Sequence, residues 1–254
     1  MDQPSTPSVA VIGGGPMGLA IAYQLALEGC RPVLLEADDR LGGMAASFDF
    51  AGVPLEHYNH FHCLEIKFDA VISTVPLPLV APVLRQGQQD PNLIAAYEAQ
   101  QSVACTCVVL QASKPITGNF WTNVNDSRFA IPGIIEMSNL RPITPYITYV
   151  PFYVPADHRD YGRPNRAFIA DSVACLKAIN PELHAADILA SHCSRYRYAQ
   201  PVCGTDFLDT LPPLNPIANI WIADTTVYYP EDRGISESVG FGRDLARKVV
   251  KALQ

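Results

Sequence analysis

A glycine-rich turn near the start of the chain limits the possible folds more than any other feature. The β-branched run at residues 9–12 predicts a strand, and the turn at residues 13–18 follows it directly. Residues 19–27 then have helical spacing, and the apolar run at residues 33–35 predicts a second strand. The chain therefore begins with a predicted parallel β-α-β unit whose turn opens the helix.

The spacing of the glycines gives each position a physical task. Gly13 permits the tight turn, Gly15 lets a pyrophosphate approach the backbone at the positive end of the helix, and Gly18 allows close contact between helix and sheet. Glu36 closes the second strand, where its carboxylate would accept hydrogen bonds from ribose hydroxyls. The pattern predicts a dinucleotide-binding turn that also includes Pro16 and Met17. The alternative is a glycine-rich turn before an ordinary helix.

A second glycine pair follows the acid at the end of the second strand. The sequence runs from Glu36 and Ala37 through Arg40 to Gly42, Gly43 and Met44. An acid followed by arginine and two glycines at this spacing resembles the signature of flavoproteins in the amine oxidase and phytoene desaturase group. The resemblance implies that the cofactor is FAD and that these residues pass close to its phosphates. The alternative is a simple turn.

The C-terminal region resembles the closing motif of the same flavoproteins. An apolar strand at 220–223 ends in Asp224, and a helix over 236–253 follows. The resemblance implies that Asp224 reaches the ribityl or phosphate region of FAD. It also implies that the helix start, with Gly234, Ile235 and Ser236, faces the flavin pyrimidine edge, where a helix N-terminus stabilises negative charge. Ser236 is the predicted N-cap, with Glu237 in the first turn. Alternatively, Asp224 and Ser236 only cap and close the sheet.

Residues 69–76 are similar to the middle strand of this group. With three motifs in the expected order, the chain resembles the FAD-dependent amine oxidase, phytoene desaturase and protoporphyrinogen oxidase-like superfamily. The implied fold is α/β: a Rossmann-type FAD-binding domain with a parallel sheet, formed by residues 1–85 and 202–254. Residues 86–201 would form a smaller, truncated α+β substrate lobe, in which proline-punctuated β-rich runs predict an antiparallel sheet.

The chain departs from this family between about Cys63 and Lys67. Relatives carry there a helical cap segment on the order of 100 residues or more, the size of a domain, and here it is missing. Without the cap, the flavin would be open to water and apolar surface would be uncovered. We therefore expect weak or broad substrate specificity and self-association as a homodimer.

Two groups of metal-binding residue types have ordinary explanations. His57, His60 and His62 would serve a structural role, a polar role beside the flavin (as the resemblance implies for His60), or a metal site, although no partner pattern completes the last. Seven cysteines without a Cys-x-x-Cys pair predict reduced thiols. Cys105 and Cys107 share one strand face and would be core residues, with a redox or metal role as the alternative.

Composition limits the class of partner. The net charge of −7 argues against nucleic acid, and no apolar run reaches membrane-spanning length. The N-terminus has no secretory signal pattern, so we expect a cytoplasmic protein. Arg195 and Arg197 would face either solvent or an acidic substrate. Tyr228 and Tyr229 would either wall the flavin or pack in the core.

The sequence thus favours an FAD-dependent oxidoreductase that dehydrogenates a C–C or C–N bond of a small molecule, with hydride transfer to flavin N5. One alternative is a redox-neutral flavin enzyme of the sugar mutase type. The other is a truncated FAD-binding scaffold without a substrate of its own.

Overall fold

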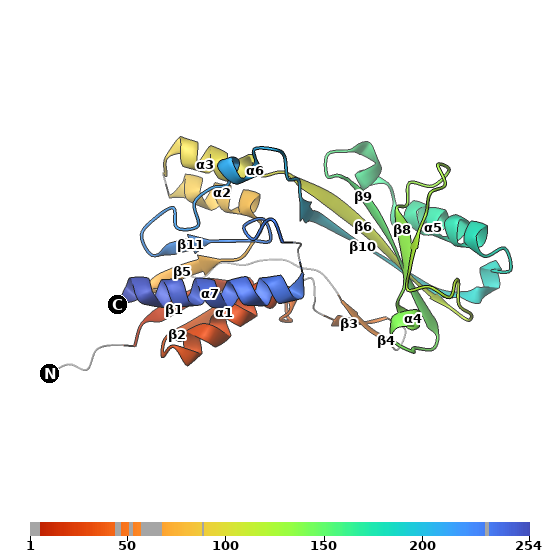
Figure 1. Cartoon of the computed structure of the whole chain (residues 1–254), viewed down its shortest axis with the longest axis horizontal. Helices are drawn as coiled ribbons and strands as arrows, with labels where there is room; N and C mark the ends of the chain where they lie inside the picture. Colours follow the sequence, from red (N-terminus) through yellow and green to blue (C-terminus); the bar gives the residue numbers. More distant parts are fainter. Residues whose placement is uncertain (1–5, 44–46, 51–52, 57–67, 88, 232–233) are drawn as a thin grey trace. The chain divides into compact units, whose positions relative to one another are not determined.

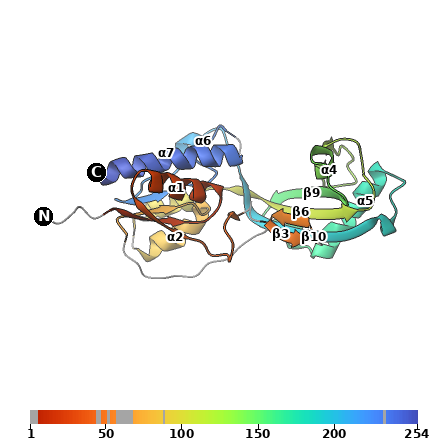
Figure 2. The ribbon, with the colours of Figure 1, turned by 90° about the horizontal axis from the view of Figure 1, so that it is seen from below.

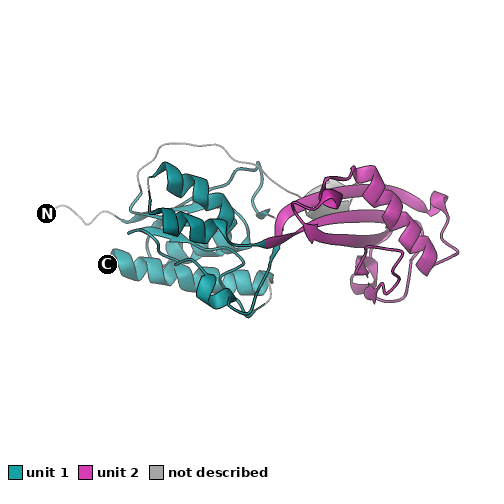
Figure 3. Ribbon diagram, turned by 90° about the horizontal axis from the view of Figure 1, so that it is seen from above, with its two compact units in different colours: residues 1–49, 54–101, 200–254 teal, residues 50–53, 102–199 magenta. Residues whose placement is uncertain are grey.

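The computed structural model describes residues 6–43, 47–50, 53–56, 68–87, 89–231 and 234–254. The chain forms two compact units (Figure 3). We call the first the Rossmann unit (residues 1–49, 54–101 and 200–254) and the second the sheet unit (residues 50–53 and 102–199). Residues 86–101 were predicted to begin the second lobe. They belong to the Rossmann unit, because their helix packs beside the preceding one.

The Rossmann unit is built on a four-stranded parallel sheet with the strand order β11-β5-β1-β2. Its strands are β1 (Ser8–Ile12), β2 (Arg31–Leu35), β5 (Ala70–Ser73) and β11 (Ile220–Ile222). All four strands predicted from apolar runs are confirmed. Their continuous apolar character follows from burial on both faces, as in other parallel sheets.

Helices cover both faces of this sheet. The helices of the unit are α1 (Pro16–Leu27), α2 (Leu77–Gln86), α3 (Pro91–Glu98), the short α6 (Phe207–Thr210) and α7 (Ile235–Leu253). Figures 1 and 2 show α1 and α7 side by side on one face, with α2 on the opposite side. Val11 of β1, Ile21 of α1 and Val249 of α7 are fully buried in one core cluster. Among the described helices, none is both long and apolar enough to cross a membrane.

The helix α2 was not predicted from the sequence. Pro76, Pro78 and Pro82 interrupt the apolar run at residues 70–84, but Pro76 is the N-cap residue and the helix tolerates the other two. Pro78 lies in the first turn, where its missing N–H has no intrahelical partner. Pro82 lies inside the helix, and burial of Leu77, Val80 and Leu84 against α3 compensates for the lost hydrogen bond.

The sheet unit contains a five-stranded antiparallel sheet with the order β10-β6-β9-β8-β7. Its strands are β6 (Ser102–Ala112), β7 (Trp121–Asn123), β8 (Gly133–Glu136), β9 (Tyr146–Pro155) and β10 (Ile188–Pro201). The helices are α4 (Met137–Leu140), α5 (Asn165–Ile179), and the 3-10 turns η2 (Arg159–Gly162) and η3 (Ala185–Asp187). A separate two-stranded sheet pairs β3 (Ser47–Phe50) with β4 (Val53–Glu56). The predicted fold class, a parallel Rossmann-type sheet plus an antiparallel second sheet, is confirmed.

The core of the sheet unit lies between this sheet and α5. Alternate residues of β6 and β9, including Val108, Leu110 and Phe152, are buried with Phe168 and Leu176 of α5. The rings of Phe152 and Phe168 meet edge to face with centroids 5.0 Å apart. Burying each such large side chain contributes roughly 1.5–3 kcal/mol, so the helix-covered face holds this unit together.

Candidate dinucleotide-binding site

The four parallel strands end at the same level. Ile12 is in register with Leu35 and with Ser73, and Ser73 is in register with Ile222. After β1 the chain forms β2 on one side and then β5 on the other, so the strand order reverses direction beside β1. Ligands of open α/β sheets bind outside the carboxyl ends of the strands at such a switch point. The two sequence motifs that follow β1 and β2 are therefore brought to one edge.

The first glycine turn is held tightly against the sheet. Gly13 has φ of +100° and donates a 2.8 Å hydrogen bond from its N–H to the carbonyl of Leu35. A Cβ placed on Gly18 would lie 1.8 Å from the carbonyl oxygen of Gly13, so no larger residue fits there. By contrast, a Cβ on Gly15 would meet no atom of the described residues within 4 Å. The turn is thus closed behind Gly18 and open in front of Gly15.

The start of α1 faces this open space without a side-chain cap. Gly15 is the N-cap residue in extended backbone, and Pro16 is the first helical residue. No acidic side chain occupies the first turn. The first N–H groups of a helix have no intrahelical acceptors and carry the positive end of the helix dipole. This end of α1 therefore favours a bound anion.

Glu36 ties the ends of β1 and β2 together. Its Oε2 accepts a hydrogen bond from Gly14 N–H. Its Oε1 accepts hydrogen bonds from Ala37 N–H at 2.8 Å and Asp38 N–H at 3.1 Å. A carboxylate has about four lone-pair sites, so these three contacts orient the group and leave acceptor capacity for a ligand hydroxyl. Glu36 thus also fixes the glycine turn, a role that its position in the sequence does not predict.

The second glycine pair folds against the first turn. Gly42 N–H donates a 2.7 Å hydrogen bond to the carbonyl of Gly14, and Gly42 and Gly43 have φ of +120° and +55°. A Cβ on Gly43 would lie 3.0 Å from Gly15 Cα. The two motifs therefore form one continuous backbone surface. The exposed Arg40 lies on the loop between them. Met44 and His60 lie outside the described residues, as do His57, His62 and the junction at 63–67.

Asp224 follows β11 and fastens the start of α2. Its Oδ2 accepts from Leu77 N–H and its Oδ1 from Thr226 N–H, both at 2.8 Å. Burial raises the pKa of the Asp224 carboxyl, and these hydrogen bonds oppose that effect. The side chain thus performs the capping role that was one of its two interpretations. It does so at the same carboxyl edge as Gly13 and Glu36, because β11 is the outer strand next to β5.

The predicted N-cap of the last helix was wrong by two residues. Gly234, with φ −90° and ψ 162°, is the N-cap residue, and α7 begins at Ile235, so Ser236 lies in the first turn. Backbone that is extended through Gly234 leaves Ser236 already helical, and a helical residue cannot cap its own helix. Glu237 is in the first turn, as predicted. As in α1, no side chain caps the N-terminus of α7.

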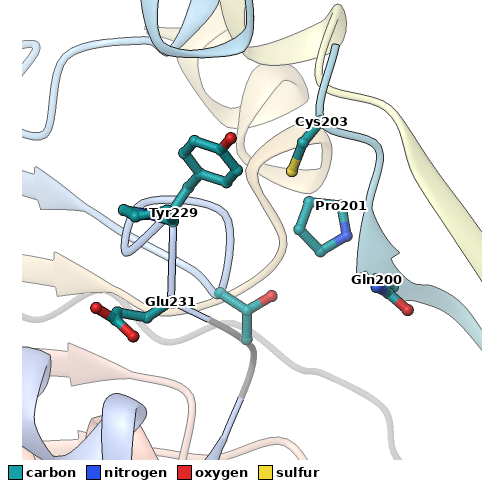
Figure 4. A pocket seen from close by; sticks show the side chains of 7 residues that line it. Gln200, Pro201, Cys203, Tyr229 and Glu231 are labelled. Atoms are coloured by element: carbon teal, nitrogen blue, oxygen red, sulfur yellow. The ribbon is translucent and has the colours of Figure 1, made fainter. Parts of the chain in front are cut away.

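A pocket of about 250 Å³ opens beside the segment that leads into α7 (Figure 4). The neighbouring residues Tyr228 and Tyr229 differ in exposure: only Tyr229 lines the pocket. Tyr229 is 41 % exposed, lines the pocket and meets Phe207 edge to face at 5.2 Å. Tyr228 is buried, with its hydroxyl 3.0 Å from Ser238 Oγ. The other lining residues are Gln200, Pro201, Cys203, Thr225, Pro230 and Glu231.

The cysteines of the described chain are free thiols. Burial raises the pKa of the Cys107 thiol on β6 above its ordinary value, which keeps this thiol protonated and weakly reactive. Within the described ranges, no cluster of three histidine, cysteine, aspartate or glutamate side chains has metal-binding geometry.

Comparison with known proteins identifies the first motif region and the fold. Residues 11–67 match the family model of the NAD(P)-binding Rossmann-like domain. The "putative protoporphyrinogen oxidase" of Exiguobacterium sp. 255-15 superposes with a TM-score of 0.78, over 98% of this chain and 100% of that chain, at 10% identity. Reduced UDP-galactopyranose mutase gives 0.73 over 98% and 94% of the two chains, also at 10% identity.

A putrescine oxidase bound to putrescine gives a TM-score of 0.69 over 97% of this chain and 99% of that chain, at 10% identity. Likeness at this identity establishes the fold, and the predicted resemblance is confirmed at that level. The chain combines a Rossmann-like parallel sheet with a separate antiparallel sheet, in the fold shared by a putative protoporphyrinogen oxidase, a UDP-galactopyranose mutase and a putrescine oxidase.

Proposed function

We propose that this chain binds FAD at the carboxyl edge of its parallel sheet. The observation that carries the proposal is the joint surface of two glycine turns, with open space in front of Gly15 and the Glu36 carboxylate beside it. A pyrophosphate would lie on this surface at the start of α1, within reach of Pro16, Met17 and the Gly42–Gly43 turn. Glu36 would hold the adenosine ribose. A side chain at Gly15 would fill the space that the phosphates need.

The C-terminal motif would serve the other half of the cofactor. Residues Gly234, Ile235 and Ser236 form the start of α7, whose positive end would stabilise negative charge on a flavin ring. The Glu237 carboxylate lies against Gly234 in this first turn and would have to turn away from the flavin. Asp224 would support this region by fixing α2 and the Thr226 turn. Bound FAD would supply the hydride acceptor at N5, as flavins do. The residues of the chain would position the cofactor and set the electrostatic field around it.

The reaction that we favour is dehydrogenation of a C–C or C–N bond in a small-molecule substrate. The likeness in fold to a protoporphyrinogen oxidase-like protein and to a putrescine oxidase supports this class. The likeness to UDP-galactopyranose mutase supports the second candidate, a redox-neutral flavin enzyme. A cofactor-binding scaffold without a substrate of its own is the third.

Cofactor titration is the first test. Equilibrium binding of FAD, FMN and NAD should give the tightest complex with FAD, because only FAD joins an adenosine half for Glu36 to a flavin for α7. FMN has no adenosine half, and NAD has no flavin. Equal affinity for FMN and FAD would contradict the proposal, because Glu36 and the glycine turns would then not hold the adenosine half of the cofactor.

Anaerobic mixing with candidate substrates is the second test. Loss of the oxidised flavin absorbance on mixing with an amine, or with a compound whose C–C bond can be dehydrogenated, would support the dehydrogenase. Turnover only after prior reduction, with no net oxidation of the substrate, would identify the mutase-type enzyme. If the chain binds FAD but shows neither flavin bleaching nor turnover after reduction with any candidate substrate, the scaffold hypothesis is supported.

The predicted absence of the cap bears on the oligomeric state. Strands β6 and β9 were expected to be uncovered, and the residues on the side away from α5 include the 40 % exposed Tyr153. Self-association through such a surface stays a prediction. Sedimentation would give the mass, and iodide quenching of flavin fluorescence would report exposure. A monomer with an inaccessible flavin would contradict the open-site prediction.

A further inference from the structure

Two arginines on strand β10 face the same side of the antiparallel sheet. Arg195 and Arg197 are two residues apart, which places their Cα atoms about 6.6 Å apart on one strand face. The guanidinium carbon of Arg195 lies 5.4 Å from the ring centroid of Phe168, a buried residue of α5. The pair therefore lies on the face that α5 covers.

Among the described residues, no carboxylate oxygen lies within 4.0 Å of the guanidinium nitrogens of these two arginines. A third arginine, Arg163, also stacks on Phe168 at 5.0 Å, but it is paired with Asp171 at 2.7 Å. Arg195 donates from Nη2 to the backbone carbonyl of Arg163, while its buried Nε has no acceptor. In the described part of the chain, neither Arg195 nor Arg197 forms an ion pair. Two positive charges thus remain side by side.

The start of α5 lies at the same place. The hydrogen bond from Arg195 to Arg163 also holds the guanidinium next to the start of α5. That start has Pro164 as its N-cap residue, no side-chain cap and no acid in its first turn. Asp160 is the acidic residue nearest in sequence to Pro164. Its carboxylate lies within 4.0 Å of the His158 and Arg159 side chains.

We propose that Arg195 and Arg197 form a binding site for a phosphate group on the α5 face of the sheet unit. Two uncompensated guanidinium groups match a doubly charged oxyanion better than a single carboxylate, and arginine presents donors in the geometry that phosphate oxygens accept. The site lies outside the proposed dinucleotide surface, which belongs to the other unit. It therefore stands whether or not the chain binds FAD.

The test is an NMR titration of the full chain with phenyl phosphate and with succinate at constant ionic strength. Both titrations are run without nucleotide and again with saturating FAD. We expect saturable shifts of the Arg195 and Arg197 side-chain resonances with phenyl phosphate in both conditions. Arg197→Ala should weaken phenyl phosphate binding at least tenfold. Arg141→Ala is the matched control, because it removes an exposed arginine from the same unit, and it should change the affinity less than twofold.

Several results would overturn the proposal. If Arg197→Ala and Arg141→Ala weaken phenyl phosphate binding equally, the loss comes from the change in net charge and not from a specific site. Shifts that vanish when FAD is present would place the phosphate on the glycine turns. If succinate binds as tightly as phenyl phosphate, the site does not prefer phosphate to carboxylate. Because Arg195→Ala would also remove the contact with Phe168, Arg195→Lys is the second variant. Lysine keeps the charge and loses the fork of donors, so an unchanged affinity would contradict the predicted geometry.

Discussion

Asp224 and Leu77 are separated by 147 residues, yet the carboxylate of Asp224 accepts a 2.8 Å hydrogen bond from Leu77 N–H. Leu77 is the first residue of α2, and Asp224 follows β11 by two residues. The same carboxylate holds Thr226 N–H at 2.8 Å. One side chain thus joins the end of the last strand to the start of a helix beside the candidate site.

We expect Asp224→Ala to lower the free energy of unfolding by about 2 kcal/mol, because two partly buried N–H groups would lose their acceptor. Urea unfolding of the cofactor-free protein measures this change. Asp224→Asn, which keeps one acceptor oxygen, should fall between Asp224→Ala and the parent. Asp209→Ala on α6 is the control for loss of an acid. Equal stability of the Asp224→Ala and Asp209→Ala variants would show that the carboxylate does not fasten α2.

Gly15 and Gly18 should respond differently to the same added methyl group. Gly18→Ala should destabilise the fold by about 3 kcal/mol, because the new Cβ would overlap a backbone carbonyl and overpacking costs that much. Gly15→Ala should fold normally, because its φ of −70° suits alanine and the space is open. FAD affinity of Gly15→Ala should nevertheless drop at least tenfold. Thermal unfolding and FAD titration of both variants separate the two effects. An unchanged FAD affinity in Gly15→Ala would show that the cofactor phosphates do not bind beside Gly15.

Glu36 should contribute to cofactor binding and to the order of the loop. Glu36→Ala should weaken FAD binding by roughly 1.5–3 kcal/mol through lost charge-assisted hydrogen bonds, which is about ten- to a hundredfold. Glu36→Gln keeps one acceptor oxygen and should lose less. Unfolding of both cofactor-free variants gives the part of the effect that comes from the lost bonds to Gly14, Ala37 and Asp38. FAD binding by Glu36→Ala as tight as that of the parent would refute the ribose contact.

The acid sensitivity of the sheet unit should depend on Asp187. The backbone N–H of His184, the ammonium of Lys114 and the hydroxyl of Ser113 lower the pKa of this carboxyl to about 2. A depressed folded-state pKa means that the contribution to stability is present above the unfolded value of 3.8 and is lost as pH falls toward 2. Unfolding free energies between pH 5 and pH 2 should therefore fall less steeply for Asp187→Asn. Asp209→Asn, which has none of these contacts, should retain the slope of the parent. Parallel slopes in parent and Asp187→Asn would contradict the assignment.

Much of the fold was predictable because its signals are local. The apolar runs at β1, β2 and β5, and the spacing of Gly13, Gly15 and Gly18, depend on residues within a few positions of each other. The helix α2 was missed because its prolines break a helix in isolation, and only burial against α3 makes the helix favourable. The start of α7 was misplaced because serine is a common N-cap, whereas the backbone at Gly234 sets the boundary.

The sequence alone determined the parallel β-α-β start, the two glycine turns and the antiparallel second sheet. Tertiary structure decided which backbone groups these residues hold. The approach of Gly42 to Gly14, the three contacts of Glu36, and the bond between Asp224 and Leu77 depend on strand register and on chain segments that are distant in sequence. Local propensity carries no information about such contacts, because the free energy that forms them comes from packing the whole sheet.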